Sequence, residues 1–265
     1  MTLLDVVLVA LVQGIAEVLP LGASGHLVLL GSLAADPQAR AAVIVAANLG
    51  IVLALLLYFW RDIFVMGRAV VKLAKGRMDP GGRLLLQVLL GTVPALVLSW
   101  GFAELGGGTG GRIVAASALT VFGLFLLAAD RLGVTVRRIE HLGWLGAALI
   151  GILQAAAAIP GVSRTGITIT AARLMGFERH DAARFSLLLA IPLMASQAAI
   201  GLIQLSHQAR LILSGDLLVA AGLSFGVAWL SVAAMMAWVD RNTFAPFALW
   251  RVVVGLGALG LALIP

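Results

Sequence analysis

The sequence has no cysteine, only one tyrosine and few charged residues. The absence of cysteine excludes disulfide bonds, thiolate catalysis and cysteine-ligated metals. Charged residues make up 11% of the chain, whereas soluble domains carry about 25%. Because a soluble domain covers much of its surface with such residues, the composition argues against an ordinary soluble protein.

Apolar residues fill most of the chain. The hydrophobic fraction is 62% and the mean hydropathy is +1.09, more than a soluble fold of this size can bury. A bilayer accepts such a chain as helices or as a closed barrel, because every backbone group must be satisfied internally. The apolar runs are long rather than alternating, which favours helices. We therefore predict an all-α, polytopic integral membrane protein with a single transmembrane domain over 1–265.

The apolar stretches are of two lengths, and only the longer ones approach the roughly 20 residues of a spanning helix. They fall at about 3–19, 24–35, 42–60, 84–103, 113–129, 143–159, 165–176, 185–206, 217–239 and 247–264. The short ones form two pairs, broken at Pro20 and Pro160 with glycines nearby. Short interrupted segments in corresponding halves predict two re-entrant hairpins. One long kinked helix per pair is the alternative.

The two broken segments resemble each other, since QGIAEVLPLGASG at 13–25 aligns without a gap with QAAAAIPGVSRTG at 154–166. The basic connections 61–83 and 130–142 are separated by two spans, so both should be cytoplasmic. The first hairpin then enters from outside and the second from the cytoplasm. This predicts an inverted-topology repeat, with a first half at about 1–130 and a second at about 140–265.

The net charge of +6 reflects these connections. It is a topology signal rather than the solvated basic face that binds nucleic acid, so no nucleic-acid partner is predicted. The segment Met1–Ala16 lacks a basic start and carries Asp5, so we do not expect a cleaved signal peptide.

Three polar residues mark the first broken segment. Glu17 follows Gln13 by four residues, which places both on one helical face. A charge at membrane depth costs about 2.5–3.5 kcal/mol, so Glu17 should face protein or a watery cavity. His26, directly after Ser24-Gly25, suits acid–base chemistry near neutral pH. A protonated or paired Glu17 and a structural His26 are the alternatives.

The second segment, PGVSRTG at 160–166, is typical of an anion site. Gly161 precedes a turn that opens a helix, where backbone N–H groups and the helix dipole favour negative charge. Arg164 adds a planar donor fork, and Ser163 and Thr165 add hydroxyl donors. Arg164 needs a counter-charge, which either Glu17 or a bound phosphate could supply, and we favour phosphate.

Two further arginines lie close to apolar sequence. Arg173 stands near a helix end and is predicted to extend its guanidinium to the membrane surface. Arg251 follows Trp250 and is interpreted as an interface anchor rather than a ligand.

These motifs resemble those of the undecaprenyl-diphosphate phosphatase family of the bacitracin-resistance type. QGIAEVLPLGASGH is similar to the family's first motif, and PGVSRTG to its second, whose usual form is Pro-Gly-x-Ser-Arg-Ser-Gly. Flanking stretches such as ANLGIVLALLLYFWRD (47–62) and WRVVVGLGAL (250–259) extend the resemblance over nearly the whole chain.

The resemblance implies a multi-pass enzyme of the bacterial inner membrane that hydrolyses undecaprenyl diphosphate to the monophosphate. That reaction recycles the lipid carrier of cell-wall synthesis. The resemblance also implies an inverted repeat, a pocket open to the periplasm and dependence on a divalent cation. A polyprenyl-phosphate flippase of the same fold, without hydrolysis, is the alternative, and a homodimer is left open.

Carried over by position, the resemblance assigns a role to each motif residue. Glu17, with Gln13, would hold Mg²⁺ or Ca²⁺ through oxygen ligands, and His26 would act as nucleophile or general acid–base. Arg164 would stabilise developing charge. The substrate phosphates would be bound by Ser24, Gly161, Ser163, Arg164 and Thr165. The first motif departs from the family pattern at Gly22 and Ala23, where serines are usual.

Overall fold

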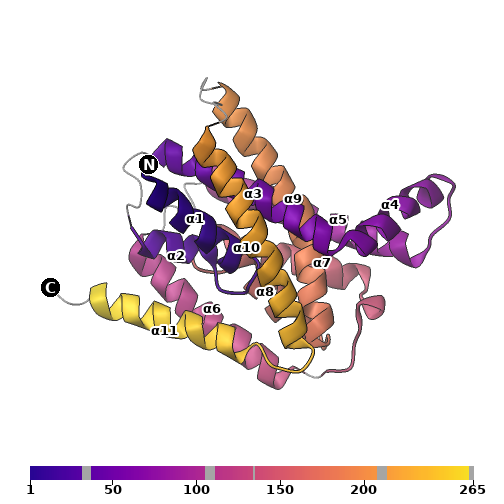
Figure 1. Ribbon diagram of the computed structural model, residues 1–265. Helices are drawn as coiled ribbons and strands as arrows, with labels where there is room; N and C mark the ends of the chain where they lie inside the picture. The colour runs from indigo at the N-terminus through magenta and orange to yellow at the C-terminus, as the bar shows by residue number, and fades with distance from the viewer. Residues whose placement is uncertain (32–36, 105–110, 134, 208–213, 263–265) are drawn as a thin grey trace.

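The computed structural model describes residues 1–31, 37–104, 111–133, 135–207 and 214–262 (Figure 1). Within these ranges the chain is helical, and its one β-bridge joins Arg137 to Phe177. The elements are α1 (Leu3–Ala16), α2 (Ala23–Leu29), α3 (Pro37–Tyr58), α4 (Trp60–Ala74), α5 (Pro80–Glu104), α6 (Arg112–Leu132), η1 (Ile139–His141), α7 (Trp144–Gln154), η2 (Ala155–Ala158), α8 (Arg164–Leu174), α9 (Arg179–His207), α10 (Gly215–Val239) and α11 (Ala245–Ala262). The prediction of an all-α protein is confirmed.

Six of these helices are long and apolar enough to cross a membrane: α3, α5, α6, α9, α10 and α11. Their outer surfaces carry large apolar side chains, such as Trp100 and Val253, which are 70% and 67% exposed. Such side chains would be unfavourable in water but suit a hydrocarbon solvent. The protein is therefore a multi-pass membrane protein, as predicted.

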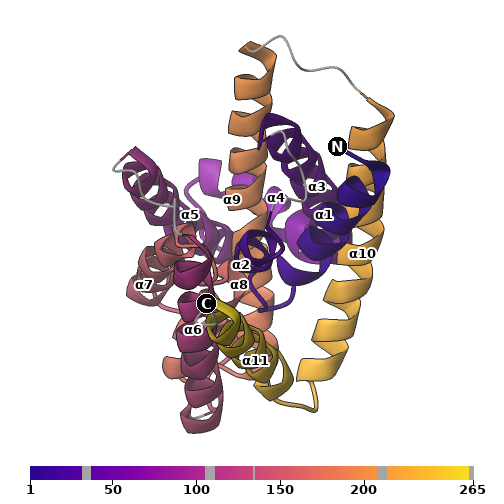
Figure 2. The ribbon, with the colours of Figure 1, turned by 90° about the vertical axis from the view of Figure 1, so that its left-hand side faces the viewer.

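The two broken segments form two helical hairpins. The helix α1 has 14 residues, and at 1.5 Å per residue it spans about 21 Å, less than the roughly 30 Å hydrocarbon core. After a turn at 17–22 the chain returns as α2, which packs against α1. In the same way α7 and η2 lead through a turn at 159–163 into α8, which packs against α7. Each pair therefore consists of two short helices separated by a turn rather than one continuous helix, and Figure 2 labels α1, α2, α7 and α8 among the long helices.

The helix contacts made by the first half of the chain correspond to those made by the second half. The helix α1 packs on α10, while its counterpart α7 packs on α5. In addition α3 contacts α9, and α6 contacts α11. If each helix is exchanged for its counterpart in the other half, the same set of contacts results, as expected for a repeat. The inverted repeat and the re-entrant path through a bilayer stay predictions.

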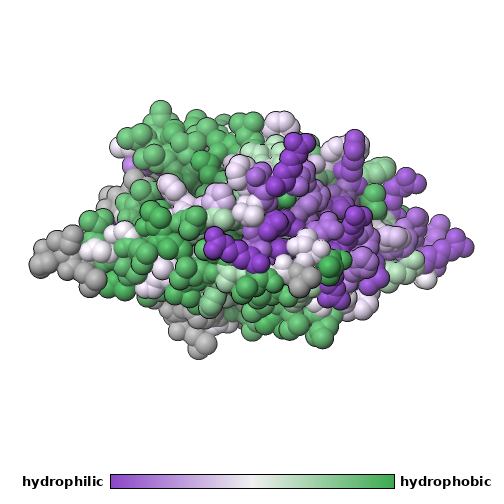
Figure 3. Space-filling view, turned by 90° about the horizontal axis from the view of Figure 1, so that it is seen from below, coloured by the Kyte–Doolittle hydropathy of each residue, from purple (hydrophilic) through white to green (hydrophobic). Residues whose placement is uncertain are grey.

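The basic connection predicted at 61–83 contains a helix of its own. The helix α4 begins at Trp60, directly after α3, and packs on α5. In Figure 3 hydrophilic residues gather toward the side where α4 lies in Figure 1, and apolar residues cover most of the remaining described surface in that view.

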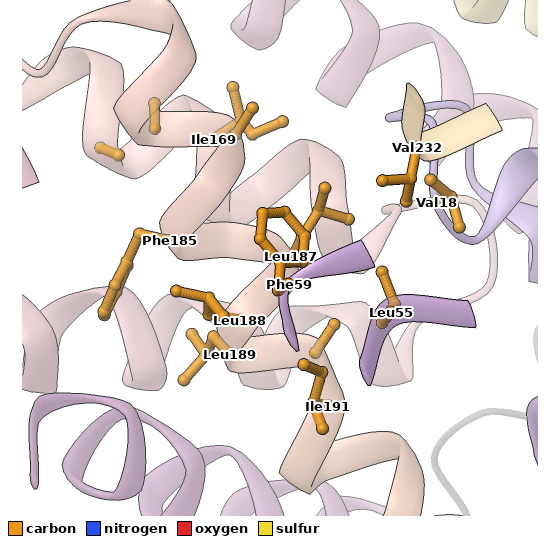
Figure 4. Packing of buried hydrophobic residues seen from close by; sticks show 14 of the residues in the cluster. Val18, Leu55, Phe59, Ile169, Phe185, Leu187, Leu188, Leu189, Ile191 and Val232 are labelled. Atoms are coloured by element: carbon orange, nitrogen blue, oxygen red, sulfur yellow. The ribbon is translucent and has the colours of Figure 1, made fainter. Parts of the chain in front are cut away.

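The main hydrophobic cluster lies between the hairpins and the long helices (Figure 4). Val18 of the first turn, Ile169 of α8 and Leu187 of α9 all belong to it and are at most 1% exposed. Leu55 and Val232 join it from α3 and α10. The cluster therefore extends from the first hairpin turn to the long helices, and it packs both hairpins against the spans.

A buried ionic cluster joins the ends of several helices. The carboxylate of Asp130 pairs with Arg173 at 3.2 Å and Arg179 at 2.7 Å, and it accepts the backbone N–H of Phe244 at 2.9 Å. The side chain of Arg173 is fully buried and also donates to the carbonyls of Gly133 and Phe177. The prediction that Arg173 reaches the membrane surface is wrong, because a buried carboxylate and several carbonyls satisfy its guanidinium.

Candidate active site

The tips of the two hairpins touch through glycines. A Cβ built on Gly25 would lie 2.7 Å from the Cα of Gly161, which is closer than the Cβ atoms of real side chains approach other heavy atoms. Gly22 and Gly161 have φ values of +90° and +95°, in the left-handed region that favours glycine. The close approach of the two turns therefore depends on the absence of side chains at these positions.

Three polar contacts connect the first hairpin to the second. Arg164 Nη2 donates to Glu17 Oε1 at 3.2 Å, so Glu17 is the counter-charge within the protein. Thr165 Oγ1 donates to the backbone carbonyl of Glu17 at 2.7 Å, and the N–H of Gly161 donates to Ser24 Oγ at 3.4 Å. The predicted residues of the two motifs thus meet, although nearly 150 residues separate Glu17 from Arg164.

Ser163 sits at the start of α8 in a strained conformation. Its φ of 65° is the only positive value at a non-glycine residue in the described parts of the chain. Its Oγ accepts the N–H of Gly166 at 3.1 Å and so caps the helix. A left-handed non-glycine residue costs about 1–3 kcal/mol and is typical of functional sites. The surrounding structure therefore holds Ser163 in a conformation that it would not adopt alone.

A cavity of about 410 Å³ opens beside the hairpin tips. It is lined by Gln13, Glu17, Ala23, Ser24, Leu27, Val28, Arg40, Ile44, Asn48, Ala157, Ser163, Arg164 and Gln197. Five of the predicted site residues are among them: Gln13, Glu17, Ser24, Ser163 and Arg164. One part of the wall is polar and another, made by Leu27, Val28 and Ile44, is apolar.

The polar part of the cavity has more cationic than anionic side chains. Arg164 is only 6% exposed, and beyond Glu17 it donates to the carbonyl of Ala190 at 3.3 Å. Arg40 is a second guanidinium on the wall, so two arginines face one carboxylate. Because a buried guanidinium favours a nearby negative charge, the cavity is suited to an anion.

Sequence reasoning missed three polar residues of the cavity: Arg40, Asn48 and Gln197. Arg40 Nη2 donates to the carbonyl of Leu27 at 2.7 Å, which fixes the guanidinium at the end of α2. Asn48 and Gln197 lie within the spans α3 and α9. A polar side chain inside an apolar span was the signal that could have found both.

His26, Gly161 and Thr165 do not line this cavity. Trp250 donates its indole N–H to His26 Nε2 at 3.0 Å, and His26 Nδ1 lies 2.9 Å from the carbonyl of Gly22. These two contacts fit a neutral imidazole that donates from Nδ1 and accepts at Nε2. The structure therefore gives His26 a positioning role, and its catalytic role stays a prediction.

Arg251 is a further residue of the hairpin tips. It is fully buried, and its Nη2 donates to the carbonyls of Gly161 at 2.9 Å and Val162 at 2.7 Å. The interpretation of Arg251 as an interface anchor is wrong, because its guanidinium points inward and satisfies the second turn. Neighbouring residues of α11, Trp250 and Arg251, thus hold one hairpin each.

The donor atoms of the cavity fit a divalent cation in part. Within the described residues no group of three His, Cys, Asp or Glu side chains converges to hold a metal. However, Gln13 Oε1 is buried without a hydrogen-bond partner, one helical turn from the Glu17 carboxylate. Mg²⁺ is often held by one or two carboxylates together with substrate phosphates. Glu17 and Gln13 fit that arrangement if the ligand brings phosphate oxygens.

Fold and cavity together define a polytopic membrane protein with a cavity, suited to an anion, beside two short-helix segments that contact each other. The profile of the family described as "Bacitracin resistance protein BacA" matches residues 6–257. The chain therefore belongs to this family.

Several relatives match nearly the whole chain. It is 50% identical to undecaprenyl-diphosphatase 1 of Paramagnetospirillum magneticum, over 98% of each chain. It is 44% identical to undecaprenyl-diphosphatase 1 of Rhodospirillum rubrum, over 99% of this chain and 96% of that one. It is 40% identical to the undecaprenyl-diphosphatase of Maricaulis maris, over 98% of each chain.

Proposed function

We propose that the protein hydrolyses undecaprenyl diphosphate to undecaprenyl phosphate and inorganic phosphate, and so recycles the lipid carrier for peptidoglycan synthesis. The observation that carries this proposal is the convergence of Glu17 and Arg164 on one cavity from two separate hairpins. The names of full-length relatives support the substrate. The cavity also has the two kinds of wall that a lipid diphosphate requires.

The substrate lies with its diphosphate among the polar residues and its isoprenoid chain along the apolar wall. Arg164 and Arg40 bind phosphate oxygens through charge-assisted hydrogen bonds, and Ser24 and Ser163 add hydroxyl donors. Leu27, Val28 and Ile44 contact the first isoprene units. Arg40 lies near the start of α3, at the end that the topology prediction places outside, so the cavity opens toward the periplasm.

Water is the attacking group in this proposal. A serine acts as a nucleophile when an adjacent base activates its hydroxyl. The partner of Ser24 Oγ is instead the backbone N–H of Gly161, which donates to it and is not a base. Both nitrogens of His26 are engaged outside the cavity. The water oxygen bonds to the terminal phosphorus, the bond to the bridging oxygen breaks, and undecaprenyl phosphate leaves while a water proton passes to solvent.

Catalysis then rests on positioning and charge stabilisation, which is the main demand of phosphoryl transfer. The Arg164 guanidinium stabilises charge on the equatorial oxygens, and its ion pair with Glu17 fixes its orientation. A divalent cation held by Glu17 and Gln13 would neutralise phosphate charge further.

The test is phosphate release from undecaprenyl diphosphate by the purified protein with Mg²⁺ or Ca²⁺. We expect turnover by the wild type and a loss of about 10²–10³-fold in Arg164→Ala, the effect of removing one transition-state donor. Arg131→Ala, which removes an exposed arginine away from the cavity, is the matched control and should keep full turnover. A wild-type protein that binds the lipid but releases no phosphate would make hydrolysis the wrong function.

Two measurements examine the finer claims. Acid quenching with a radiolabelled terminal phosphate should trap no phosphoenzyme, and a label on Ser24 or His26 would replace water as the attacking group. Binding of Mn²⁺ as a spectroscopic probe, in the presence of a non-hydrolysable diphosphate lipid, should weaken in Glu17→Gln. Equal binding by both proteins would remove Glu17 from the metal site.

A further inference from the structure

The helix α4 has an apolar strip that no other part of the described protein covers. Met66 and Ala69 form its inner side and are buried. Trp60, Phe64 and Val71 share a different side, given the helical period of 3.6 residues. Their side chains are 57%, 58% and 58% exposed. Large apolar side chains gathered on one exposed side of a helix indicate a contact with a partner or with lipid.

A basic strip runs beside the apolar one. Arg61, Arg68 and Lys75 project next to Trp60, Phe64 and Val71, and all three are exposed. The guanidinium of Arg61 lies 5.4 Å from the Trp60 ring, and that of Arg68 lies 5.5 Å from the Phe64 ring. We call these six residues the α4 face. Its three cations make no ion pair with a carboxylate in the described parts of the chain.

Neighbouring ion pairs hold α4 in place. Lys72 donates to Asp79 at 2.7 Å, and this hydrogen bond lowers the pKa of the Asp79 carboxyl below its usual range. Arg184 of α9 pairs with Asp62 in the first turn of α4. The cations that have partners thus fix the helix, while those of the α4 face remain available to a ligand.

A cavity of about 580 Å³ adjoins the α4 face. Arg61 of the face lines it together with Arg83 and Arg184, and the carboxylates Asp62, Asp79 and Glu140 line it as well. The helix follows α3 directly and precedes α5, so it lies where two spans reach one side of the membrane. The basic connections predict that this side is cytoplasmic.

We propose that the α4 face binds anionic phospholipids of the cytoplasmic leaflet. Trp60, Phe64 and Val71 enter the acyl region, and Arg61, Arg68 and Lys75 contact the phosphates. The apolar strip, which includes two aromatic rings, lies beside the basic strip, and this arrangement matches the acyl and phosphate layers of a leaflet. The six residues of the α4 face are apolar or cationic, with no carboxylate among them, which fits an anionic headgroup. This inference does not depend on the proposed phosphatase activity.

The test is the lipid selectivity of the full-length protein in bilayer discs of equimolar phosphatidylglycerol and phosphatidylcholine. Native mass spectrometry measures the ratio of the two lipids that stay bound. In the triple variant Arg61→Gln, Arg68→Gln, Lys75→Gln we expect the preference for phosphatidylglycerol to fall by at least about fivefold, which is the effect of a single basic residue at an anionic surface. Phosphatase activity in detergent should not change, because these residues lie outside the candidate active site.

The matched control removes the same charge from other connections on that side, as Arg131→Gln, Arg138→Gln, Arg241→Gln. It should keep the wild-type lipid ratio. An equal fall in both triple variants would overturn the proposal in favour of the charge of the whole surface, and an unchanged ratio in the α4 variant would overturn it outright.

Trp60 gives an independent readout of depth. Brominated phosphatidylglycerol should quench the part of the fluorescence that Trp60→Phe removes. Absence of that quenching would overturn the proposal, as would a change in oligomeric mass in the α4 variant, which would assign the face to a second copy of the chain.

Discussion

Gly25→Ala tests whether the candidate site depends on the contact between the hairpin tips. The added Cβ would lie 2.7 Å from the Cα and 3.2 Å from the N of Gly161, whereas ordinary contacts are 3.4–4 Å. Both neighbours are backbone atoms, which have no rotamer to move. The tips must therefore separate by about 1 Å, and a misplacement of that size can lower a rate by about 10²-fold. Overpacking of this kind also costs about 1–3 kcal/mol of stability.

The assay compares phosphate release and thermal unfolding of the purified variant with those of Gly222→Ala. Gly222 lies in the interior of α10 with no neighbouring atom within 4 Å of an added Cβ, so its replacement by alanine should leave turnover unchanged and should not lower the melting temperature. We expect Gly25→Ala to lose most of its turnover and to melt at a lower temperature. Wild-type turnover and melting in Gly25→Ala would refute the argument that the two turns meet through their glycines.

Three other predictions follow from the same geometry. Arg40→Gln should raise KM about tenfold, because one charge-assisted contact to a phosphate is lost, while the exposed Arg112→Gln should not; equal effects would point to general charge attraction. Arg251→Met should destabilise the protein by about 2–4 kcal/mol, because two carbonyls of the second turn lose their donor; an unchanged melting temperature would contradict this. Ser163→Gly should melt like the wild type but turn over more slowly, since glycine accepts a φ of 65°. Ser163→Ala should turn over more slowly too, and in addition its stability should fall by about 0.5–2 kcal/mol. If Ser163→Gly were less stable than Ser163→Ala, backbone strain at position 163 would not explain the difference.

Local sequence was sufficient to predict the apolar helices and the two breaks, but not the helix α4 within a basic connection. Proline and glycine next to Glu17 and Arg164 favoured hairpins over one kinked helix, because the flanking apolar runs were too short to span. The cost of a buried charge predicted that Arg164 needs a counter-charge, with Glu17 as one of two candidates and phosphate as the preferred one, and the structure places Glu17 beside it. These features depend on residue type and spacing alone.

Tertiary contacts determined what the sequence could not show. Arg173 and Arg251 stand near the ends of apolar stretches, where arginines usually reach the membrane surface, and only the packing of α6 and of the second turn places their partners around them. His26 was adjacent to the first motif, but Trp250 of the last helix engages its outer nitrogen. Arg40 joined the cavity because its guanidinium reaches back to the carbonyl of Leu27 in α2, a contact that no local pattern encodes.

The hydrophobic cluster that extends from the first hairpin turn should also act as a barrier to the passage of ions. It lies between the polar tips and the Asp130 cluster, with Val18, Ile169 and Leu187 almost fully buried. A water-filled site open to both sides of a membrane would dissipate a potential worth about 2.3 kcal/mol per charge per 100 mV. Under the proposed function, such a barrier would let the protein act on a charged headgroup within the bilayer without discharging the ion gradients of the cell.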